Sequence, residues 1–570
     1  MAAKEALKRA HSMPFGAEVL AGGGVRFRLW APAARTVDVC IAEKVLPMKA
    51  AEQGWFELVH PDAAAGTLYK YRIDGKTLVP DPASRFQPQD VDGPSEVIDP
   101  ARHEWKDTGW RSRPWLEAVV YELHVGTFTP EGTYAGVASK LNHLKEAGIT
   151  AIELLPISDF AGKRNWGYDG VLPYAPDSAY GRPSDLKALV EAAHQAGLMI
   201  FLDVVYNHFG PKGNYLSVYS PQFFTDKHKT PWGAAIDFSN PNVRQYFIHN
   251  VQYWLEEYGF DGLRFDAVHA IIDTSPRHIL EEIRDSVPRS KHLVLENDRN
   301  QAGILGPGKY NAQWNDDSHH GYHLLATGET DGYYVSYADQ PAKHLARCLA
   351  EGFAYQGEVL PFTNEPRGEK SGHLPASCFI DFLQNHDQVG NRALGERLLV
   401  LSDEEKIKAL SAIHLLAPAT PMIFMGEEWG CRQPFLFFCD FDGELGEAVR
   451  KGRQEEFSRF KSFKGKVPDP IAKSTFDAST LDWSKADHVW LAHYKNLLGL
   501  RQKHIVPLNC GSGRYRMLGE RAFEVIWDDK LTLIANCGDK VISVMTHKHA
   551  PLWSNAPAGA AWSVNWWLTK

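Results

Sequence analysis

The chain has 570 residues, of which 44% are hydrophobic and 23% are charged, and its formal net charge is −9. This balance is typical of a soluble globular protein and excludes an intrinsically disordered chain. The negative charge argues against nucleic acid as a partner. The length suits three or four units of ordinary domain size.

Cysteine usage and the N-terminal sequence bear on the cellular compartment. The seven cysteines are an odd number and no two of them have CxxC spacing, which disfavours a disulfide scaffold and a zinc ribbon. Residues 1–13 lack the apolar run of a secretory signal, and no apolar stretch approaches the ~20 residues of a membrane span. We therefore expect a cytoplasmic protein with no membrane contact; the sequence carries no signal for an oligomeric state.

Residues 1–108 are predicted to form an N-terminal β-sandwich. Apolar and polar residues alternate in short segments that Gly and Pro separate. These segments are 25–32, 36–41, 55–60 and 67–74. Several short strands at this spacing are typical of an immunoglobulin-like sandwich. Such a unit shields the next domain or binds glycan, and the sequence leaves both roles open.

Between residues 109 and 500, apolar strand segments alternate with amphipathic helices. Strands of this kind are typical of a parallel sheet that is covered on both faces. We expect eight of them, at 119–128, 149–157, 198–208, 260–268, 292–298, near 332–336, 378–387 and 421–429. The sequence thus predicts an α/β fold whose catalytic domain is a (β/α)8 TIM barrel.

The best-marked helix of this region begins after residue 240. Asn240 can cap the helix and Pro241 suits its first turn. Gly259 ends the pattern. One apolar stripe is predicted to face the core, formed by Val243, Phe247, Ile248, Val251, Trp254 and Leu255.

Residues 501–570 return to short strands, predicted at 521–529, 531–537 and 540–548. We expect a second, C-terminal β-sandwich here.

Polar residues stand where the predicted barrel strands end, which is where barrel enzymes carry their active sites. A carboxylate that ends an apolar strand is costly unless charge or hydrogen bonds compensate it. The residues follow strands three, four, five and seven, and they are Asp203, Asn207, His208, Arg264, Asp266, Glu296, His386 and Asp387.

Two carboxylates about 5–5.5 Å apart perform retaining glycoside hydrolysis. Arg264 lies two residues before Asp266 on the same strand face and would keep Asp266 ionised, as a nucleophile requires. Burial of Glu296 beside negative carboxylates would raise its pKa, which suits a general acid/base. Asp387 is expected to bind ring hydroxyls and to stabilise the oxocarbenium-like charge.

Four segments resemble the ordered motifs of the α-amylase family, glycoside hydrolase family 13. They are DVVYNH (203–208), GLRFDAVH (262–269), LVLEND (293–298) and FLQNHD (382–387). The resemblance implies the same roles: Asp266 as nucleophile, Glu296 as acid/base and Asp387 as transition-state stabiliser. The leading sandwich resembles the carbohydrate-binding-module-like unit that precedes the barrel in branching, debranching and trehalose-forming members.

Finer segments resemble the trehalose-forming hydrolases of that family, among them RNWGYDGVLPYAP, QWNDDSHH and LQNHDQVGNRALGERL. This implies cleavage of the α-1,4-glucosidic bond next to the terminal trehalose of maltooligosyltrehalose, which releases trehalose and a maltodextrin. The resemblance also implies a set of substrate-binding residues: Tyr168, Asp203, His208, Arg264, His269, Asp316, Asp317, His319, His320, His386, Gln388, Asn391 and Arg392.

The sequence departs from the family pattern at a few points. Ala270 replaces the His of starch-degrading amylases, residues after Glu296 read NDRN, and the segment 364–377 is only loosely similar. The loop 209–239 has no dense carboxylate cluster, and the adjacent residues of the DDSHH segment cannot all face one ion. We therefore expect neither a metal nor a cofactor.

Two alternatives remain open. A glycogen branching enzyme of the same family would use the same three carboxylates to transfer a glucan chain. A non-catalytic glucan-binding protein is less favoured, because all three carboxylates and Arg264 are present.

Overall fold

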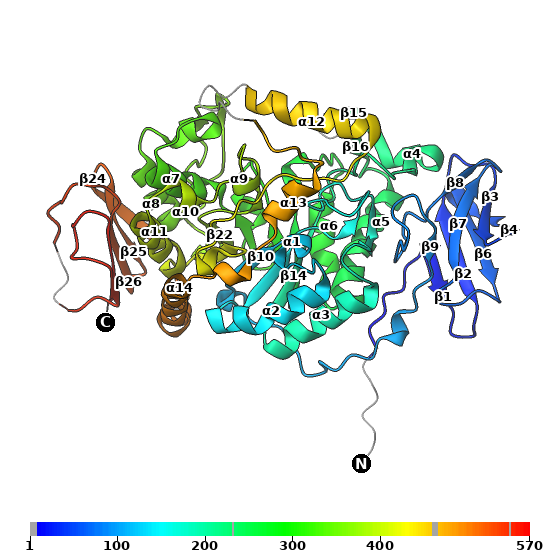
Figure 1. The fold of residues 1–570 in the computed structure, drawn as a ribbon, viewed down its shortest axis with the longest axis horizontal. Coiled ribbons are helices and arrows are strands. Elements are labelled where there is room, and N and C mark those ends of the chain that lie inside the picture. Colours follow the sequence, from blue (N-terminus) through cyan, green and yellow to red (C-terminus); the bar gives the residue numbers. More distant parts are fainter. Residues whose placement is uncertain (1–7, 231–232, 459–465, 546–548, 570) are drawn as a thin grey trace, which may run out of the picture.

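The computed structural model describes residues 8–230, 233–458, 466–545 and 549–569. Residues 1–7, on which part of the secretory-signal prediction rests, lie outside this range. A β-sandwich, a closed barrel and a C-terminal sheet follow one another along the molecule, and the barrel lies between the other two (Figure 1).

Two antiparallel sheets form the N-terminal sandwich, in the orders β1-β2-β6-β5 and β4-β3-β7-β8, with β9 beside β7. Their bounds are β1 (Gly16–Val19), β2 (Val25–Trp30), β3 (Val37–Ile41), β4 (Lys44–Pro47), β5 (Lys49–Ala50), β6 (Trp55–His60), β7 (Leu68–Ile73), β8 (Thr77–Val79) and β9 (Ser95–Glu96). In β2, Val25, Phe27 and Leu29 are buried between partly exposed Arg26 and Arg28. The alternation that predicted the strand therefore turns its apolar face into the core.

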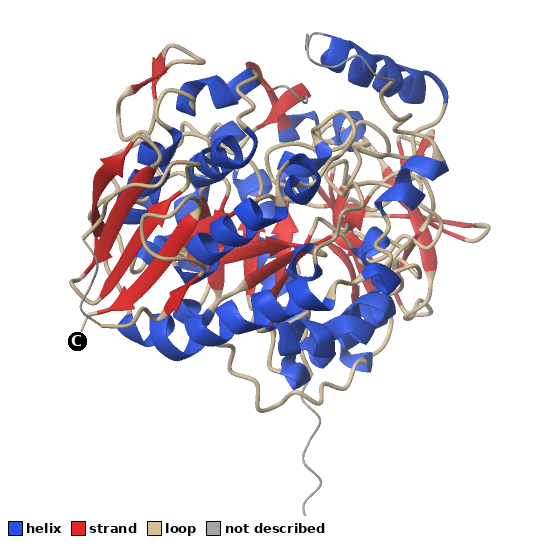
Figure 2. Ribbon diagram, turned by 60° about the vertical axis from the view of Figure 1, so that its left-hand side comes forward, coloured by secondary structure: helices blue, strands red, loops and turns tan. Residues whose placement is uncertain are grey.

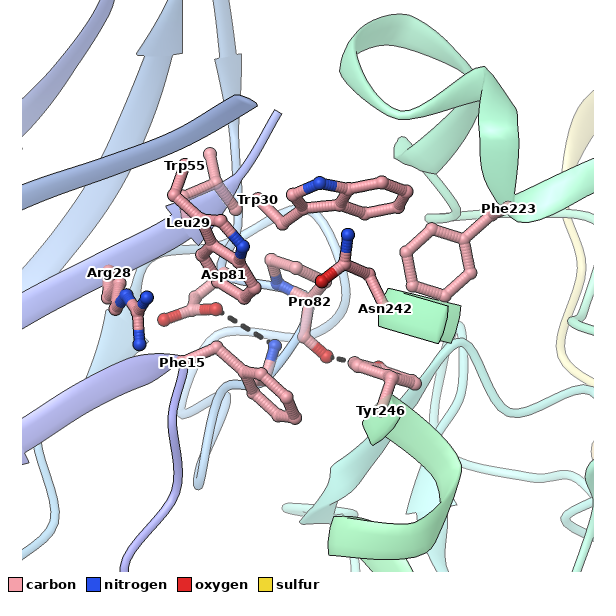
Figure 3. A pocket seen from close by; sticks show the side chains of 11 residues that line it. Phe15, Arg28, Leu29, Trp30, Trp55, Asp81, Pro82, Phe223, Asn242 and Tyr246 are labelled. Carbon is pink, nitrogen blue, oxygen red and sulfur yellow. Dashed lines mark hydrogen bonds between the residues drawn. The ribbon is translucent and has the colours of Figure 1, made fainter. Parts of the chain in front are cut away.

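Aromatic side chains join the sandwich to the barrel (Figure 3). Phe15 and Trp55 line one side of a crevice of about 20 Å³, and Phe223 and Tyr246 line the other. The Tyr246 hydroxyl donates a hydrogen bond to the carbonyl of Pro82 at 2.6 Å. The crevice has room for about one water molecule, so it is a packed interface and too small for a sugar.

Eight parallel strands close into a barrel in chain order, which confirms the predicted (β/α)8 fold. The strands are β10 (Val120–Leu123), β11 (Ala151–Leu154), β14 (Met199–Val204), β17 (Gly262–Phe265), β18 (His292–Leu295), β19 (Ala312–Trp314), β22 (Phe379–Phe382) and β23 (Thr420–Phe424). Helices surround these strands (Figure 2).

The longer helices of this ring are α2 (Tyr134–Ala147), α3 (Pro183–Ala196), α5 (Pro241–Gln252), α6 (Ile279–Ser286), α7 (Asp316–Thr327), α8 (Pro341–Glu351), α11 (Glu404–Leu416) and α14 (His488–Leu500). A further helix, α12 (Gly443–Ser458), lies at the upper rim in both views (Figures 1 and 2). The shorter helices are α1 (Val125–Phe128), α4 (Leu216–Tyr219), α9 (His386–Gly390), α10 (Leu398–Leu401) and α13 (Lys473–Ser479). Paired short strands decorate the loops: β12 (Ser158–Asp159) with β13 (Leu172–Pro176), β15 (Phe224–Thr230) with β16 (Gly233–Ile236), and β20 (Val359–Leu360) with β21 (Glu365–Pro366).

The predicted caps and stripe of α5 are confirmed. The Asn240 side chain accepts a hydrogen bond from the backbone N–H of Asn242 at 3.0 Å, and Pro241 opens the first turn. The helix continues beyond Gln252 as a π-helical turn before Gly259, whose φ of 76° favours glycine. All members of the predicted stripe are buried: Val243, Phe247, Ile248, Val251, Trp254 and Leu255.

A small cluster fills the barrel interior, separate from the larger core between strands and helices. Its larger members are Val120, Met199, Phe201, Val294, Trp314, Ile380, Phe382 and Met422. Because side chains of a strand alternate between its two faces, Asp203 extends the inward row of Phe201 toward the carboxyl end of the barrel. The interior thus changes from apolar to charged at the end that carries the site.

The sixth strand is β19, and its predicted position near 332–336 is wrong. The segment 332–337 forms a 3-10 helix, η8 (Gly332–Tyr337). Three residues are too few to show a strand pattern, whereas the aromatic run 333–337 imitates one. The connection from β18 to β19 contains one 3-10 turn, η7 (Ala302–Ile304), and no α-helix.

The C-terminal region is one five-stranded antiparallel sheet, in the order β24-β25-β26-β28-β27. The strands are β24 (Gly513–Gly519), β25 (Ala522–Trp527), β26 (Leu531–Asn536), β27 (Trp553–Ser554) and β28 (Ser563–Leu568). The predicted strands at 521–529 and 531–537 correspond to β25 and β26. Residues 540–545 form no strand, and 546–548 lie outside the described residues.

Barrel helices supply the second layer under this sheet. The indole N–H of Trp527 donates to the carbonyl of Leu349 in α8 at 3.0 Å, and that of Trp566 donates to the carbonyl of Ala412 in α11 at 3.1 Å. The described residues of this region thus lack the second sheet of the expected sandwich, because the apolar face of the first sheet is already covered by α8 and α11.

Candidate active site

The carboxylates that the sequence singles out gather at the carboxyl end of the barrel. Asp203 lies in β14, Asp266 directly follows β17, and Glu296 directly follows β18. His386 and Asp387 begin the short helix α9 beyond β22. Parallel neighbouring strands end at the same edge, so residues far apart in the chain become neighbours there.

One guanidinium connects three of these carboxylates. Arg264 of β17 is fully buried and lies 2.7 Å from Asp203, 3.1 Å from Asp266 and 2.7 Å from Glu296. Its guanidinium carbon stands 3.9 Å from the ring centroid of Trp314 in β19. Three carboxylates that share one buried cation cannot all ionise without cost, so their protonation states are coupled.

Glu296 has the surroundings of a carboxyl group that holds its proton. Burial raises its pKa, Arg264 opposes the rise and Asp266 adds to it. One oxygen of Glu296 also accepts the backbone N–H of Ala267 at 2.9 Å. Ala267 itself has a left-handed φ of 38°, a strained conformation for a residue with a Cβ.

Asp266 accepts hydrogen bonds at both carboxylate oxygens. Arg264 donates to one oxygen at 3.1 Å, and the amide of Asn207 donates to the other at 2.7 Å. Both oxygens of Asp266 thus act as hydrogen-bond acceptors and are held in place by their donors, as a nucleophilic carboxylate requires.

A second group surrounds these carboxylates. The Tyr168 hydroxyl donates to Asp203 at 2.6 Å, and its ring stacks on His386 with centroids 5.1 Å apart. His208 bonds the carbonyl of Tyr168 through Nε2 at 3.0 Å. His386 Nε2 lies 3.5 Å from Asp387, whose side chain is 39% exposed. The structure therefore brings Tyr168, His208 and His386 to the carboxylates, as expected.

His386 is held in its charged form. Burial acts against the charge, but the carboxylates of Asp387 and Glu122 outweigh it and raise the pKa of His386 to about 9. Glu122 of β10 accepts both the ring Nδ1 at 2.6 Å and the backbone N–H at 3.0 Å.

Asp316, at the start of α7, stands near Glu296. Burial and then the Glu296 carboxylate raise the pKa of Asp316 to about 8. The amide of Gln388 donates to Asp316 at 3.4 Å. Both expected residues therefore belong to the charged cluster.

Asp317, the next residue, is turned into the protein. It is fully buried, accepts the Tyr337 hydroxyl at 2.6 Å and pairs with Arg367 at 3.0 Å. Its expected substrate contact gives way to a supporting role, because successive helical side chains point in different directions.

His319 and His320 are likewise buried. His319 bonds the carbonyl of Leu383 at 2.7 Å and the hydroxyl of Tyr334 at 3.0 Å. The ring of His320 lies 4.6 Å from that of Tyr337, and burial lowers its pKa well below the usual value. The contacts described for these two histidines are with a backbone carbonyl and with neighbouring rings.

The remaining expected substrate-binding residues lie in different parts of the site region; they are Arg392, Asn391 and His269. Arg392 forms a two-point pair with Glu329, at 2.7 and 3.0 Å. Asn391 donates to Asp387 at 3.2 Å. His269 lines a cavity of about 640 Å³ between α6 and the β18–β19 connection. Asn391 thus hydrogen-bonds a carboxylate predicted to be catalytic, and His269 lies close enough to Glu296 for its charge to lower the pKa of that residue.

The sequence analysis missed two acidic members of the cluster, Glu122 and Glu153. Glu122 holds His386, and Glu153 of β11 is buried with neither carboxylate oxygen hydrogen-bonded among the described residues. Burial raises the pKa of Glu153 well above its usual value. Each is a single acidic residue inside an apolar strand, a signal that was available in the sequence.

Metal-binding clusters and membrane-spanning helices are not present in the described part of the chain. No group of three or more His, Cys, Asp or Glu side chains there is arranged to hold a metal ion. No helix there is both long and apolar enough to cross a membrane.

Known proteins share this architecture. Residues 83–229 match the family "Alpha amylase, catalytic domain", and residues 14–100 match "Carbohydrate-binding module 48 (Isoamylase N-terminal domain)". The malto-oligosyltrehalose trehalohydrolase of Saccharolobus solfataricus is 44% identical over 497 residues, 85% of this chain and 86% of that protein. This chain belongs to the malto-oligosyltrehalose trehalohydrolase family. The resemblance inferred from the motifs is thereby confirmed.

A second trehalohydrolase and a solved structure are also similar over nearly the whole chain. The protein of that name from Deinococcus radiodurans is 42% identical over 538 residues, 92% of this chain and 88% of its own. A crystal structure of a candidate alpha amylase from Salmonella typhimurium is 45% identical, with a TM-score of 0.95 over 98% of this chain and 100% of that one.

Proposed function

We propose that this protein is a retaining glycoside hydrolase that cleaves the α-1,4-glucosidic bond next to the terminal trehalose of maltooligosyltrehalose. It releases trehalose and a shortened maltodextrin. The observation that carries the reaction type is the shared guanidinium of Arg264, which lies within 3.1 Å of both Asp266 and Glu296. The trehalose specificity is supported by membership of the trehalohydrolase family.

In the first step an Asp266 oxygen attacks the anomeric carbon of the glucose next to the trehalose. The bond from that carbon to the trehalose oxygen breaks, and Glu296 gives its proton to the departing oxygen. The maltodextrin remains on Asp266 as an ester.

In the second step water attacks the same carbon from the face that trehalose left. Glu296, now ionised, takes the proton of the water, and the ester bond to Asp266 breaks. Two inversions at one carbon retain the α configuration. Asp387 and the charged His386 lie 3.5 Å apart beside this centre and are suited to hold the hydroxyls of the glucose that reacts.

Product analysis by chromatography tests the proposal. We expect the purified protein to release free trehalose from maltotriosyltrehalose and to react much more slowly with maltopentaose, which has equally many glucose units. Similar cleavage of both would indicate a general amylase, and branched or elongated products would indicate the branching-enzyme alternative. No reaction with either would leave a glucan-binding protein.

A further inference from the structure

A cavity of about 640 Å³ lies beside α6, where the barrel lacks a helix. In a (β/α)8 barrel each strand is followed by a helix of the outer ring. The fifth strand, β18, is followed only by the 3-10 turn η7, so the fifth helix of the ring is missing next to α6. The cavity is lined by α6, by residues 268–278 before it and by residues 299–310 of the β18–β19 connection. Its volume is typical of pockets that hold small metabolites.

Part of the cavity wall is apolar. Val268, Ile271, Leu280 and Tyr310 line it, and each of these side chains is buried. Small-molecule sites usually combine such a wall with a few polar groups that fix the orientation of the ligand. The charged residues of the lining therefore decide which ligand the cavity suits.

The carboxylates of the lining already have cationic partners. Asp273 pairs with Arg244 at 2.7 Å. Arg277 pairs with Asp285 and lies 3.9 Å from Glu281. These carboxylates are therefore not available to a cation from solution, and their negative charge is largely balanced.

Three cations of the lining have no carboxylate partner among the described ion pairs. They are Arg284 of α6 and, from the β18–β19 connection, Arg299 and Lys309. Arg299 and Lys309 are exposed, and the ammonium group of Lys309 donates to the backbone carbonyl of Gly303. The cavity wall thus carries a surplus of positive charge.

Arg284 is the most informative of these cations because it is only 5% exposed. One terminal nitrogen donates to the carbonyls of Val287 and Pro288, at 2.9 and 3.0 Å. Its Nε is buried and has no hydrogen-bond partner among the described residues. Burial and the charge of Arg289 lower the pKa of Arg284. A buried guanidinium with an unused donor is costly unless an anion compensates it.

We propose that this cavity binds a phosphate monoester whose phosphate group is held by Arg284, Arg299 and Lys309. Guanidinium groups match the oxygens of a phosphate, and a phosphate monoester carries a charge of about −1.5 to −2 at neutral pH. The apolar wall favours an ester over the free ion, because the body of the ester can cover it. A sugar phosphate and a nucleoside monophosphate share this chemistry, and the experiment separates them. The inference does not depend on the proposed function.

Isothermal titration calorimetry at constant ionic strength tests the proposal. The probes are glucose-6-phosphate and adenosine monophosphate, each compared with its unphosphorylated counterpart, glucose or adenosine, and with inorganic phosphate. We expect one of the two esters to bind about tenfold or more tightly than its counterpart, as a charge-assisted contact typically gives. Inorganic phosphate should bind more weakly than that ester, and the ester that binds identifies the body that the apolar wall accepts.

A double variant locates the binding in the cavity. Arg299→Gln with Lys309→Gln should raise the Kd of the bound ester about tenfold or more. Both side chains are exposed, so we expect an unchanged thermal midpoint without ligand. Arg514→Gln with Lys530→Gln is the matched control. It removes the same charge from the C-terminal sheet, where these side chains are 63% and 50% exposed, and should leave the Kd unchanged.

Several outcomes would overturn the inference. One is that neither ester binds, or that inorganic phosphate alone does, which would indicate an adventitious ion only. Another is that glucose or adenosine binds as tightly as its ester. A third is that both double variants raise the Kd equally, which would show a response to overall charge and no local site. The product analysis of the proposed function uses none of these compounds, so the two proposals can fail separately.

Discussion

At the residue scale, the proposed catalysis depends on the hydrogen bonds that Arg264 makes to two carboxyl groups. The guanidinium donates to Asp266 through one terminal nitrogen and to Glu296 through the other. Asp266 accepts one donor at each of its two oxygens, whereas both donors of Glu296 reach the same oxygen and burial raises the pKa of Glu296. Similar groups thus acquire different roles from their surroundings.

Asp266→Asn should abolish turnover while the fold stays intact, because an amide cannot form the ester intermediate. Circular dichroism and calorimetric binding of maltooligosyltrehalose would check that the variant folds and binds. Activity close to that of the wild type would remove Asp266 from the role of nucleophile.

Glu296→Gln should lower kcat by ~10²–10⁴-fold, the usual contribution of general acid/base catalysis. A glycoside with an activated aryl leaving group needs little protonation, so its first step should suffer least. Because the acid must be protonated and its pKa is raised, wild-type kcat should fall as pH rises through that pKa, and this limb should vanish in the variant. The same loss on both kinds of substrate would contradict the assignment.

Glu122→Gln should reduce stability in a pH-dependent way. The pKa of His386 is raised from 6.5 to about 9, so its charged form stabilises the fold fully below pH 6.5, and this contribution is lost as pH rises through about 9. The variant removes one carboxylate that favours the charge. The difference in thermal midpoint between wild type and variant should therefore be largest near pH 6 and shrink toward pH 10. A constant difference would argue against this role of Glu122.

At the element scale, prediction succeeded where a pattern was long enough to repeat. The helix α5 has a cap, a proline and an apolar stripe that recurs over successive turns, and each could be read from neighbouring residues. The strand β19 has three residues and no such pattern. The 3-10 helix η8 carries the aromatic residues that imitated a strand.

The cap of α5 offers a test at this scale. Asn240→Ala removes the side-chain acceptor for the N–H of Asn242 and should cost ~1 kcal/mol of helix stability. Asn240→Asp keeps an acceptor and is the matched control. Thermal unfolding should show a lower midpoint for the alanine variant alone, and kcat should not change. Equal midpoints for all three proteins would show that the cap does not limit stability.

In the site, as in the helices and strands, local motifs could be predicted and long-range contacts could not. Asp266, Glu296 and Asp387 each stand in a short motif that can be recognised from a few neighbouring residues. The contact of Glu122 with His386 joins β10 to α9, and the two residues lie 264 positions apart. The inward turn of Asp317 depends on its contacts with Tyr337 and Arg367, which stand in later segments. Tertiary packing decides such contacts, so the sequence could not supply them.

At the scale of the whole molecule, a buried ion pair joins the N-terminal unit to the barrel. Arg85 lies 3.5 Å from Glu257 and donates to the carbonyl of Ala17 at 2.9 Å. Lys187 of α3 lies 3.5 Å from the same Glu257. The order of the three units could be predicted from the sequence, but this joint could not, because its members stand in unrelated segments.

Arg85→Met should lower the thermal midpoint, since breaking a buried pair costs up to ~3–5 kcal/mol and Glu257 then keeps only Lys187 as a cationic partner. The triple variant Arg85→Met, Lys187→Met and Glu257→Gln should recover part of the loss, because no charge of this group is then left without its partner. The midpoint of each variant, measured at one pH, checks this. A triple variant less stable than the single one would contradict the explanation.

The arrangement around Arg264 has a consequence for the whole catalytic cycle. In the proposed mechanism Asp266 is negative and Glu296 holds a proton before the reaction; once the ester has formed, Asp266 is neutral and Glu296 is negative. The guanidinium contacts both residues. The negative charge therefore passes from the carboxylate beside one of its nitrogens to the carboxylate beside the other, and the net charge of the three side chains stays the same. The net charge of the active site is therefore constant through the proposed cycle. No ion has to bind or leave, and the surrounding protein does not need to rearrange between the two steps.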